Sequence, residues 1–335
     1  MVDKSHHIQR LGKLSESKRG AIAAANDEAI ERGAQLLRAG KLVAFPTETV
    51  YGLGANALDA AAVARIFEAK NRPRFDPLIV HVSGAAMLEL VAAAIPPQAR
   101  ALVDRFWPGP LTVVVPKTGA VPELVTAGLP TVAVRMPSHP VARALIERAG
   151  VPVAAPSANP FGQLSPTRAG HVARMLGERV DLILDGGPTA LGVESTIVLA
   201  EPPVLLRPGA VPVESVEAVI GPIARTLADA QAPLAPGRLA RHYAAATPLR
   251  IVEPGAVPAA EREGAAVLAW RGAPAGYAAE RVLSPSGDLS EAAAHLFEYL
   301  HELDALGLRR IDVEAVPETG LGLAIMDRLR RARTI

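Results

Sequence analysis

Short apolar runs alternate with alanine-rich amphipathic segments along most of the chain. Residues 59–70, DAAAVARIFEAK, place Val63, Ile66 and Phe67 at helical spacing behind Asp59, which can cap the start of a helix. Runs of strand-forming residues separate this segment from other helical ones, a pattern typical of α/β proteins. We therefore expect an α/β domain with a mixed sheet, its strands near 41–45, 78–82, 111–115, 131–136, 151–155, 181–187, 195–200 and 203–209.

The alternation pauses where Pro and Gly interrupt any sustained period, over residues 221–247, and then resumes. The resumed pattern predicts a second, smaller α/β domain, with strands near 249–253, 264–270 and 310–316 and helices over 290–307 and 320–332. The arginines at 328, 330, 331 and 333 are interpreted as a solvated helix face. The predicted organisation is a flexible leader (1–20), a larger α/β domain (21–222), a linker or lid (223–247) and the smaller domain (248–335).

Composition narrows the possible functions. Half of the 335 residues are hydrophobic but only 4% are aromatic, so the core must consist mostly of Ala, Val, Leu and Ile. The 35 basic and 34 acidic residues balance, which argues against an extensive nucleic-acid-binding face. The absence of cysteine excludes disulfides, thiolate zinc sites and a cysteine nucleophile. The polar start and the lack of a long apolar run favour a cytoplasmic protein without a membrane span.

The segment KNRPRFDPLIVHV, residues 70–82, brings Lys70, Arg72 and Arg74 close together at the end of a predicted helix. Cations there complement the helix dipole, so a solvated helix end is one interpretation. Pro73 and Pro77 restrict the backbone, and a rigid loop carrying Lys and Arg also suits phosphate binding. These residues alone leave both interpretations open.

Further polar groups follow predicted strands, where ligands of α/β sheets usually bind. PTETVYGLG (46–54) is either an ordinary strand-to-helix turn or a ligand loop. Arg135 lies in an apolar strand and needs an anionic partner, which could be a neighbouring carboxylate or a ligand. We find no GxxxxGK[ST] loop, no GxGxxG after a strand, and no HExxH or GxSxG motif.

Six segments in order carry a family resemblance: PTETVYGLG, KNRPRFDPLIVHV, FWPGPLT, AVRMPSHP, PSAN and ESTIV. Together they resemble the threonylcarbamoyl-AMP synthases over residues 25–209, the extent of a YrdC-like catalytic domain. PGRLARHYA and the closing RIDVEAVPETGLGLAIMDRLRRA resemble the long, two-domain members. The resemblance implies a YrdC-like domain with a twisted mixed sheet flanked by helices, and a smaller Rossmann-like α/β domain.

The resemblance also implies an activity. L-threonine, bicarbonate or CO2, and ATP would give threonylcarbamoyl-AMP and pyrophosphate in a nucleotidyltransferase reaction. Downstream transferase proteins would then place the threonylcarbamoyl group on the adenosine next to the anticodon of tRNA. A carbamate is already anionic, so positioning and charge neutralisation would carry most of the catalysis. Mg²⁺ would accompany the triphosphate.

The family's functional residues can be matched to positions in this chain. The threonine contacts implied are Thr49, His81, Arg135 and Ser195. The catalytic set implied around the phosphates is Lys70, Arg72, Ser157 and Asn159. Further ATP contacts implied are Asp76, Thr131, Ser165, Arg207 and Tyr243. The linker group Arg241-His242-Tyr243, which could otherwise be plain surface, would fold over the site as a lid against water.

Two positions depart from the family pattern. Asp76 stands where the family usually has Asn, which puts a carboxylate beside phosphates and makes a direct contact doubtful unless a metal or Arg74 offsets its charge. Ala245 stands where a Pro is usual, which makes the linker less rigid.

Two other functions compete with this interpretation. Hydrogenase-maturation carbamoyltransferases share the YrdC-like part, but they carry cysteine zinc motifs that this chain lacks. A non-catalytic RNA-binding or ribosome-associated module is the alternative, and the balanced charge speaks against it.

Overall fold

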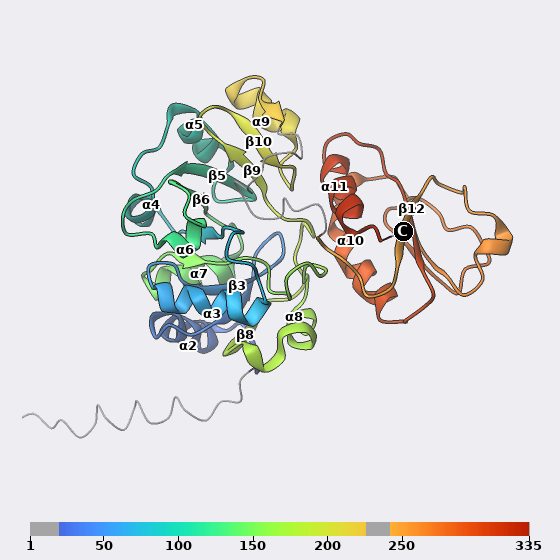
Figure 1. Cartoon of the computed structure of the whole chain (residues 1–335), viewed down its shortest axis with the longest axis horizontal. Coiled ribbons are helices and arrows are strands. Elements are labelled where there is room, and N and C mark those ends of the chain that lie inside the picture. The colour runs from blue at the N-terminus through green and yellow to red at the C-terminus, as the bar shows by residue number, and fades with distance from the viewer. Residues whose placement is uncertain (1–19, 226–241, 335) are drawn as a thin grey trace, which may run out of the picture.

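The computed structural model describes residues 20–225 and 242–334. The predicted leader, apart from Gly20, and linker positions 226–241, with Arg241, lie outside the described residues. The described chain forms two α/β units, each built on its own sheet (Figure 1). The predicted fold class is confirmed.

The larger unit is built on a mixed sheet of eleven strands in the order β1-β8-β2-β3-β7-β4-β6-β5-β9-β10-β11. The sheet contains parallel pairs such as β4 with β6 and antiparallel pairs such as β5 with β6. The strands are β1 (Ile22–Ala24), β2 (Val43–Pro46), β3 (Tyr51–Asn56), β4 (Ile79–His81), β5 (Leu111–Pro116), β6 (Thr131–Arg135), β7 (Val153–Ala154), β8 (Leu182–Asp185), β9 (Thr196–Leu199), β10 (Val204–Arg207) and β11 (Ala224–Arg225). The sheet thus extends into the segment that the sequence pattern assigns to the linker.

Helices cover both faces of this sheet and bury two apolar clusters against it. One cluster lies under α2 and α7, and the larger one includes residues of α3, α5 and α9. The helices are α2 (Asp27–Arg38), α3 (Ala60–Lys70), α4 (Ala85–Val91), α5 (Pro97–Phe106), α6 (Glu123–Thr126), α7 (Pro140–Ala149), α8 (Ala169–Leu176) with the 3₁₀ turn η2 (Gly177–Arg179), and α9 (Val213–Ile220). As expected, Asp59 caps α3, accepting from the amides of residues 61 and 62.

The PTETVYGLG segment differs from the expected strand-to-helix turn. β2 and β3 pair antiparallel, so this segment forms a β-hairpin whose turn carries Thr47 and Thr49. Gly54 lies inside β3, where a Cβ atom would stand 2.7 Å from the ring of Phe45 and 2.9 Å from Val153. Glycine at this position lets β2, β3 and β7 pack closely. Gly54 is therefore explained by strand packing and not by the start of a helix.

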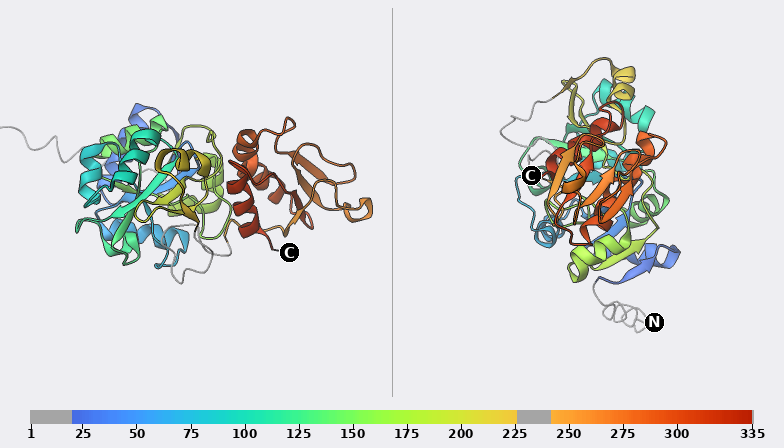
Figure 2. Two further views of the ribbon diagram at one scale, coloured as in Figure 1. Left: turned by 90° about the horizontal axis from the view of Figure 1, so that it is seen from above. Right: turned by 90° about the vertical axis from the view of Figure 1, so that its right-hand side faces the viewer.

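The smaller unit has four parallel strands in the order β12-β15-β13-β14. Its two long helices lie on the sheet face turned toward the catalytic domain (Figures 1 and 2). The strands are β12 (Leu249–Val252), β13 (Ala266–Ala269), β14 (Ala279–Val282) and β15 (Ile311–Glu314); the helices are η3 (Ala259–Glu261), α10 (Leu289–Asp304) and α11 (Gly322–Ala332). The predicted second α/β domain is therefore present.

One apolar cluster spans the two units. Val50, Leu164 and Val193 of the catalytic domain belong to the same cluster as the buried residues of α10 and α11. Gly192 has a φ of 68°, and a Cβ atom there would stand 2.3 Å from the carbonyl oxygen of Ala293 in α10. Only glycine fits so close an approach in a left-handed backbone. No helix of the described residues is long and apolar enough to span a membrane.

Candidate active site

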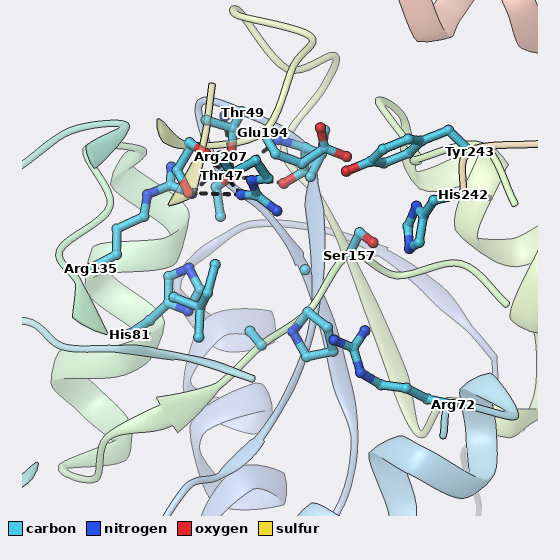
Figure 3. Close-up of a pocket in the computed structure, with 16 residues that line it drawn as sticks. Thr47, Thr49, Arg72, His81, Arg135, Ser157, Glu194, Arg207, His242 and Tyr243 are labelled. Atoms are coloured by element: carbon cyan, nitrogen blue, oxygen red, sulfur yellow. Dashed lines mark hydrogen bonds between the residues drawn. The ribbon is translucent and has the colours of Figure 1, made fainter. Parts of the chain in front are cut away.

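One pocket collects polar side chains from strands that are far apart in sequence. It is lined by the β2–β3 turn, β3, β4, β6, β10, the loops after α3 and β7, the residues just before β9 and the linker residues 242–243 (Figure 3). Eight predicted site residues lie on its wall: Thr49, Arg72, His81, Arg135, Ser157, Ser195, Arg207 and Tyr243. Lys70, Asp76, Thr131, Asn159 and Ser165 do not line it.

Arg135 dominates one end of the pocket. The parallel β4–β6 register places it beside His81. Its Nη1 donates to Oγ1 of Thr49 at 3.0 Å and its Nε to the carbonyl of Gly109 at 3.2 Å. Its Nη2 forms an ion pair with Oε1 of Glu48 at 2.7 Å. The anionic partner that a buried arginine requires is therefore a neighbouring carboxylate in this structure.

At this end Glu48 is ionised, whereas His81 is neutral. Burial raises the pKa of Glu48, but the charge and hydrogen bond of Arg135 outweigh burial and hold that pKa below its ordinary value. The amide of Ser138 also donates to Glu48 at 3.2 Å. Burial, helped by Arg135, lowers the pKa of His81 to about 3. At neutral pH this end thus holds an ionised pair and a neutral imidazole.

Ser195 and Arg207 connect this end to the rest of the pocket. The hydroxyls of Ser195 and Thr112 lie 2.8 Å apart. Arg207 donates from Nη2 to the carbonyl of Ser195 at 2.9 Å and to its hydroxyl at 3.2 Å. A buried guanidinium therefore fixes the β9 strand end at which Ser195 faces the pocket.

Arg72 reaches the pocket from the opposite end (Figure 3). Its Nη2 lies 2.8 Å from Oδ2 of Asp76, and the guanidinium donates to the carbonyls of Asp76 and Pro77 at 3.1 and 2.9 Å. Its side chain is only 4% exposed, whereas Arg74, two residues on, is exposed. The solvated-helix-end interpretation is therefore wrong for Arg72 and holds for Arg74.

Lys70 is buried directly behind the Ser157–Asn159 loop. Its Nζ donates to the backbone carbonyls of Ser157 and Asn159, and lies 3.4 Å from Oδ1 of Asn159. Burial and the nearby charge of Arg72 lower the pKa of Lys70 well below its ordinary value. Burial raises the pKa of Asp76, and Arg72 and Lys70 offset only part of that effect. Burial thus disfavours the charged forms of all three groups at this end.

The linker closes the pocket with two aromatic residues. His242 and Tyr243 are 6% and 1% exposed. Tyr243 has a φ of 63°, a left-handed backbone that is costly for a bulky residue. The amide of His242 donates to the carbonyl of Arg331 and that of Ala244 to Gly162, which hold this conformation from both sides. Burial lowers the pKa of His242 to about 3.

The predicted residues outside the pocket wall have other surroundings. Thr131 begins β6, where Pro116 of β5 is its register partner. The Oγ of Ser165 donates to Oε1 of Glu194 at 2.5 Å, and the Asn159 amide donates to the carbonyl of Gln163 at 2.8 Å. Asp76 is fully buried against Arg72, so its carboxylate has a partner in the chain itself.

Sequence reasoning missed three buried charged residues: Glu48, Glu194 and Arg328. Arg328 contradicts the solvated-face interpretation, since it is 1% exposed and pairs with Glu194 at 2.7 Å. Its position could have been found, because residues 324, 325, 328, 329 and 332 form one stripe of α11. Glu48 could also have been found. It is adjacent in sequence to Thr49, which was matched to the same threonine site as Arg135, and Arg135 was expected to need an anionic partner.

Comparisons with known proteins agree with this geometry. The Sua5/YciO/YrdC family model, described as telomere recombination, matches residues 35–209, and the threonylcarbamoyl-AMP synthase C-terminal domain matches residues 211–333. The threonylcarbamoyl-AMP synthase of Pyrococcus abyssi is 48% identical over 90% of this chain and 93% of its own length. The chain belongs to the threonylcarbamoyl-AMP synthase family. It is accordingly an enzyme of the nucleotidyltransferase type that uses ATP as a substrate.

Two further relatives extend the likeness. The Bacillus subtilis threonylcarbamoyl-AMP synthase is 46% identical over 92% of this chain and 93% of its own. The crystal structure of P. abyssi Sua5 complexed with L-threonine superposes with a TM-score of 0.86 at 44% identity, covering 93% of this chain and 96% of that one. Both domains and their arrangement are therefore shared across a full-length relative.

Proposed function

We propose that this pocket makes threonylcarbamoyl-AMP from L-threonine, bicarbonate or CO2, and ATP. The observation that carries the assignment is the pairing of two buried arginines, Arg135 and Arg72, at opposite ends of one pocket. One end suits a small zwitterion and the other a polyanion. P. abyssi Sua5, which has been solved with L-threonine, supports the first half of this division.

The threonine end binds the amino acid through Thr49, His81, Arg135 and Ser195. Arg135 takes the substrate carboxylate, and Glu48 and Thr49 hold the guanidinium in place. Neutral His81 can accept or donate a hydrogen bond without adding a charge. The amine condenses with bicarbonate, losing water, to give a carbamate held toward the centre of the pocket.

The phosphate end completes the reaction by positioning ATP. A carbamate oxygen attacks the α-phosphorus, the bond from that phosphorus to the bridging oxygen breaks, and pyrophosphate leaves with the electron pair. Arg72 faces the phosphates, while Lys70 shapes the Ser157–Asn159 loop from behind and adds positive charge. Because the described residues hold no cluster of three or more metal-binding side chains, we assign Mg²⁺ to the ATP phosphates and water, as is usual for this ion.

The nucleotide lies toward Arg207 and Tyr243, with Asp76, Thr131 and Ser165 supporting it from behind the wall. The linker residues 242–243 act as a lid that keeps water from the mixed anhydride. Their burial and their attachment to α11 and Gly162 support this role. We expect Tyr243→Ala to shorten the lifetime of the product; unchanged synthesis and unchanged lifetime would contradict the lid. Downstream transferase proteins then deliver the group to tRNA.

Pyrophosphate release from ATP tests the function directly. Purified full-length protein is assayed with both L-threonine and bicarbonate, with each alone, and with neither, and the adenylate is identified by mass. We expect release only when both are present. Release that ignores threonine would keep the nucleotide site but assign another acceptor. No release from folded protein would favour the RNA-binding module.

A further inference from the structure

Arg328 is the largest side chain among those that are fully buried in the described structure. It belongs to α11 of the smaller domain, yet its contacts with described residues lie in the catalytic domain or the linker, with one exception. Its Nε donates to Oε2 of Glu194 at 2.7 Å and its Nη2 to the carbonyl of Pro208 at 3.0 Å. The exception is Asp327, its neighbour on α11, at 2.6 Å. The smaller domain thus inserts a charged group behind the wall of the pocket.

Glu194 transmits this contact to the pocket. Its carboxylate lines the pocket, with Oε2 held by Arg328 and Oε1 by the hydroxyl of Ser165. Its own carbonyl accepts from the amide of Ala210. Both oxygens and the backbone are therefore fixed, and Arg328 supplies the only cation within ion-pair distance of it among the described residues.

Tyr243 receives a second contact from the same guanidinium. The guanidinium carbon of Arg328 lies 5.3 Å from the centre of the Tyr243 ring, within the range of a cation–π interaction. Phe297 of α10 packs against the same ring at 5.6 Å. One residue outside the pocket therefore holds two that line it, Glu194 in the sheet domain and Tyr243 in the linker.

We propose that Arg328 is a positioning residue for synthesis, through which the smaller domain completes the nucleotide end of the active site. The proposal rests on the function proposed above and goes beyond it, because it gives the smaller domain a part in the reaction. It predicts that the geometry of Glu194 and Tyr243, and hence ATP binding, depends on α11.

The alternative is that the Arg328–Glu194 pair only attaches the two domains. The shared apolar cluster already does this, and buried ion pairs add little net stability compared with apolar contacts of similar size. A buried network whose two outer members both face the pocket is better explained by the placement of those members.

Three single variants of the full-length protein test the proposal. Arg328→Met removes the charge and keeps much of the volume. Arg328→Lys keeps the charge but cannot make the forked contacts. Arg330→Met is the matched control, because it removes the same charge from the same helix. Among the described residues, Arg330 pairs only with Glu318, which is half-exposed at the surface. Each is assayed by pyrophosphate release over a range of ATP and threonine concentrations.

For Arg328→Met we expect the KM for ATP to rise about tenfold or more, with the KM for threonine within about twofold of wild type. Arg328→Lys should lie between Arg328→Met and wild type, and Arg330→Met should match wild type. A fall in kcat alone with both KM values unchanged, or no change, overturns the proposal. If wild type itself releases no pyrophosphate, the proposed function fails instead.

The pH profile separates positioning from attachment. Arg328, Arg207 of β10, and His242 and Tyr243 of the linker are the charged or titratable groups that face Glu194. Burial raises the pKa of Glu194, and Arg328 is the main charge that lowers it below its ordinary value. In Arg328→Met the acidic limb of kcat/KM for ATP should therefore move to higher pH, and in Arg328→Lys it should return toward wild type. An unmoved limb overturns the proposal.

If Arg328→Met does not fold, a double variant can still test the proposal. Glu194→Gln combined with Arg328→Met removes the unpaired buried carboxylate, so we expect this pair to fold where Arg328→Met alone does not. Its KM for ATP should remain raised. A double variant with the wild-type KM for ATP would overturn the proposal, and so would Arg328→Lys with that same wild-type KM.

Discussion

The two ends of the pocket each hold a buried arginine paired with a carboxylate, but the pairs differ. At the threonine end, Arg135 meets Glu48 and still donates to Thr49, and the pKa of Glu48 lies below its ordinary value. At the phosphate end, Arg72 meets Asp76, and burial raises the pKa of that carboxyl. Charge pairing therefore decides the pKa shift of Glu48, and burial decides that of Asp76.

The difference indicates whether the charges at each end are already balanced or would be balanced by a bound ligand. The Arg135–Glu48 pair is already formed, so the proposed threonine site is preformed. Burial lowers the pKa values of both Lys70 and Arg72, and the charge of Arg72 lowers that of Lys70 further. A triphosphate would reverse both effects, because an opposite charge favours the charged form. We therefore expect ATP to complete the charge distribution of the proposed phosphate end.

The largest effect should come from comparing two arginines of one loop. Arg72→Ala should lower kcat/KM for ATP by about 100-fold or more, because a desolvated charge-assisted contact to phosphate is lost. Arg74→Ala should stay within about twofold of wild type, because Arg74 is exposed. Pyrophosphate release gives both values, with circular dichroism to show that each variant is folded. A folded Arg72→Ala enzyme with unimpaired turnover would return Arg72 to a structural role.

A smaller effect should distinguish the two carboxylates. Glu48→Gln should cost about 2–4 kcal/mol of unfolding free energy at pH 7, since it leaves Arg135 buried without a counter-charge. Asp76→Asn should cost about 1 kcal/mol or less, because the ionised form of Asp76 is already disfavoured by burial. Asp76→Asn should also bind ATP more tightly, since it removes a negative charge behind the phosphates. Urea unfolding and nucleotide titration measure these quantities.

The pH dependence gives the same comparison an internal control. The stability that ionised Glu48 contributes is present above its ordinary pKa of 4.5 and is lost as pH falls through its lowered folded value. Asp76, with a raised pKa, destabilises the fold as pH rises above 3.8. The gap between Glu48→Gln and Asp76→Asn should therefore narrow toward acid pH. Equal costs at pH 7 would contradict the distinction between the two ends.

The sequence predicted the chemistry of the pocket better than its supports. The family resemblance, and not local periodicity, supplied His81 and Arg135, which line the pocket, and Lys70, which lies behind its wall. The β2–β3 hairpin was not predicted. Gly54 is required by close packing against Phe45 of the antiparallel neighbour β2 and against Val153, which is remote in sequence. Arg328 was misinterpreted because charge was given more weight than its position on an apolar stripe.

The smallest effect should come from the two buried histidines, one at each end. Burial lowers the pKa of both His81 and His242 to about 3. The unfolded chain takes up a proton near pH 6.5 that the folded chain refuses, so stability is full above that pH and falls as pH decreases toward 3. Each histidine should therefore cost about 1 kcal/mol at pH 6, and replacing either by Gln should remove that share.

ATP should separate these two histidines. Lys70, Arg72 and Arg207 all disfavour the protonated form of His242, and a triphosphate would neutralise them. We expect a non-hydrolysable ATP analogue to raise the pKa of His242 and to leave that of His81, whose neighbours are Arg135 and Glu48, almost unchanged. Histidine ring NMR with and without the analogue measures both, with His81→Gln and His242→Gln for assignment. If the two rings shift together, the phosphates lie between the ends and the division of the pocket is wrong.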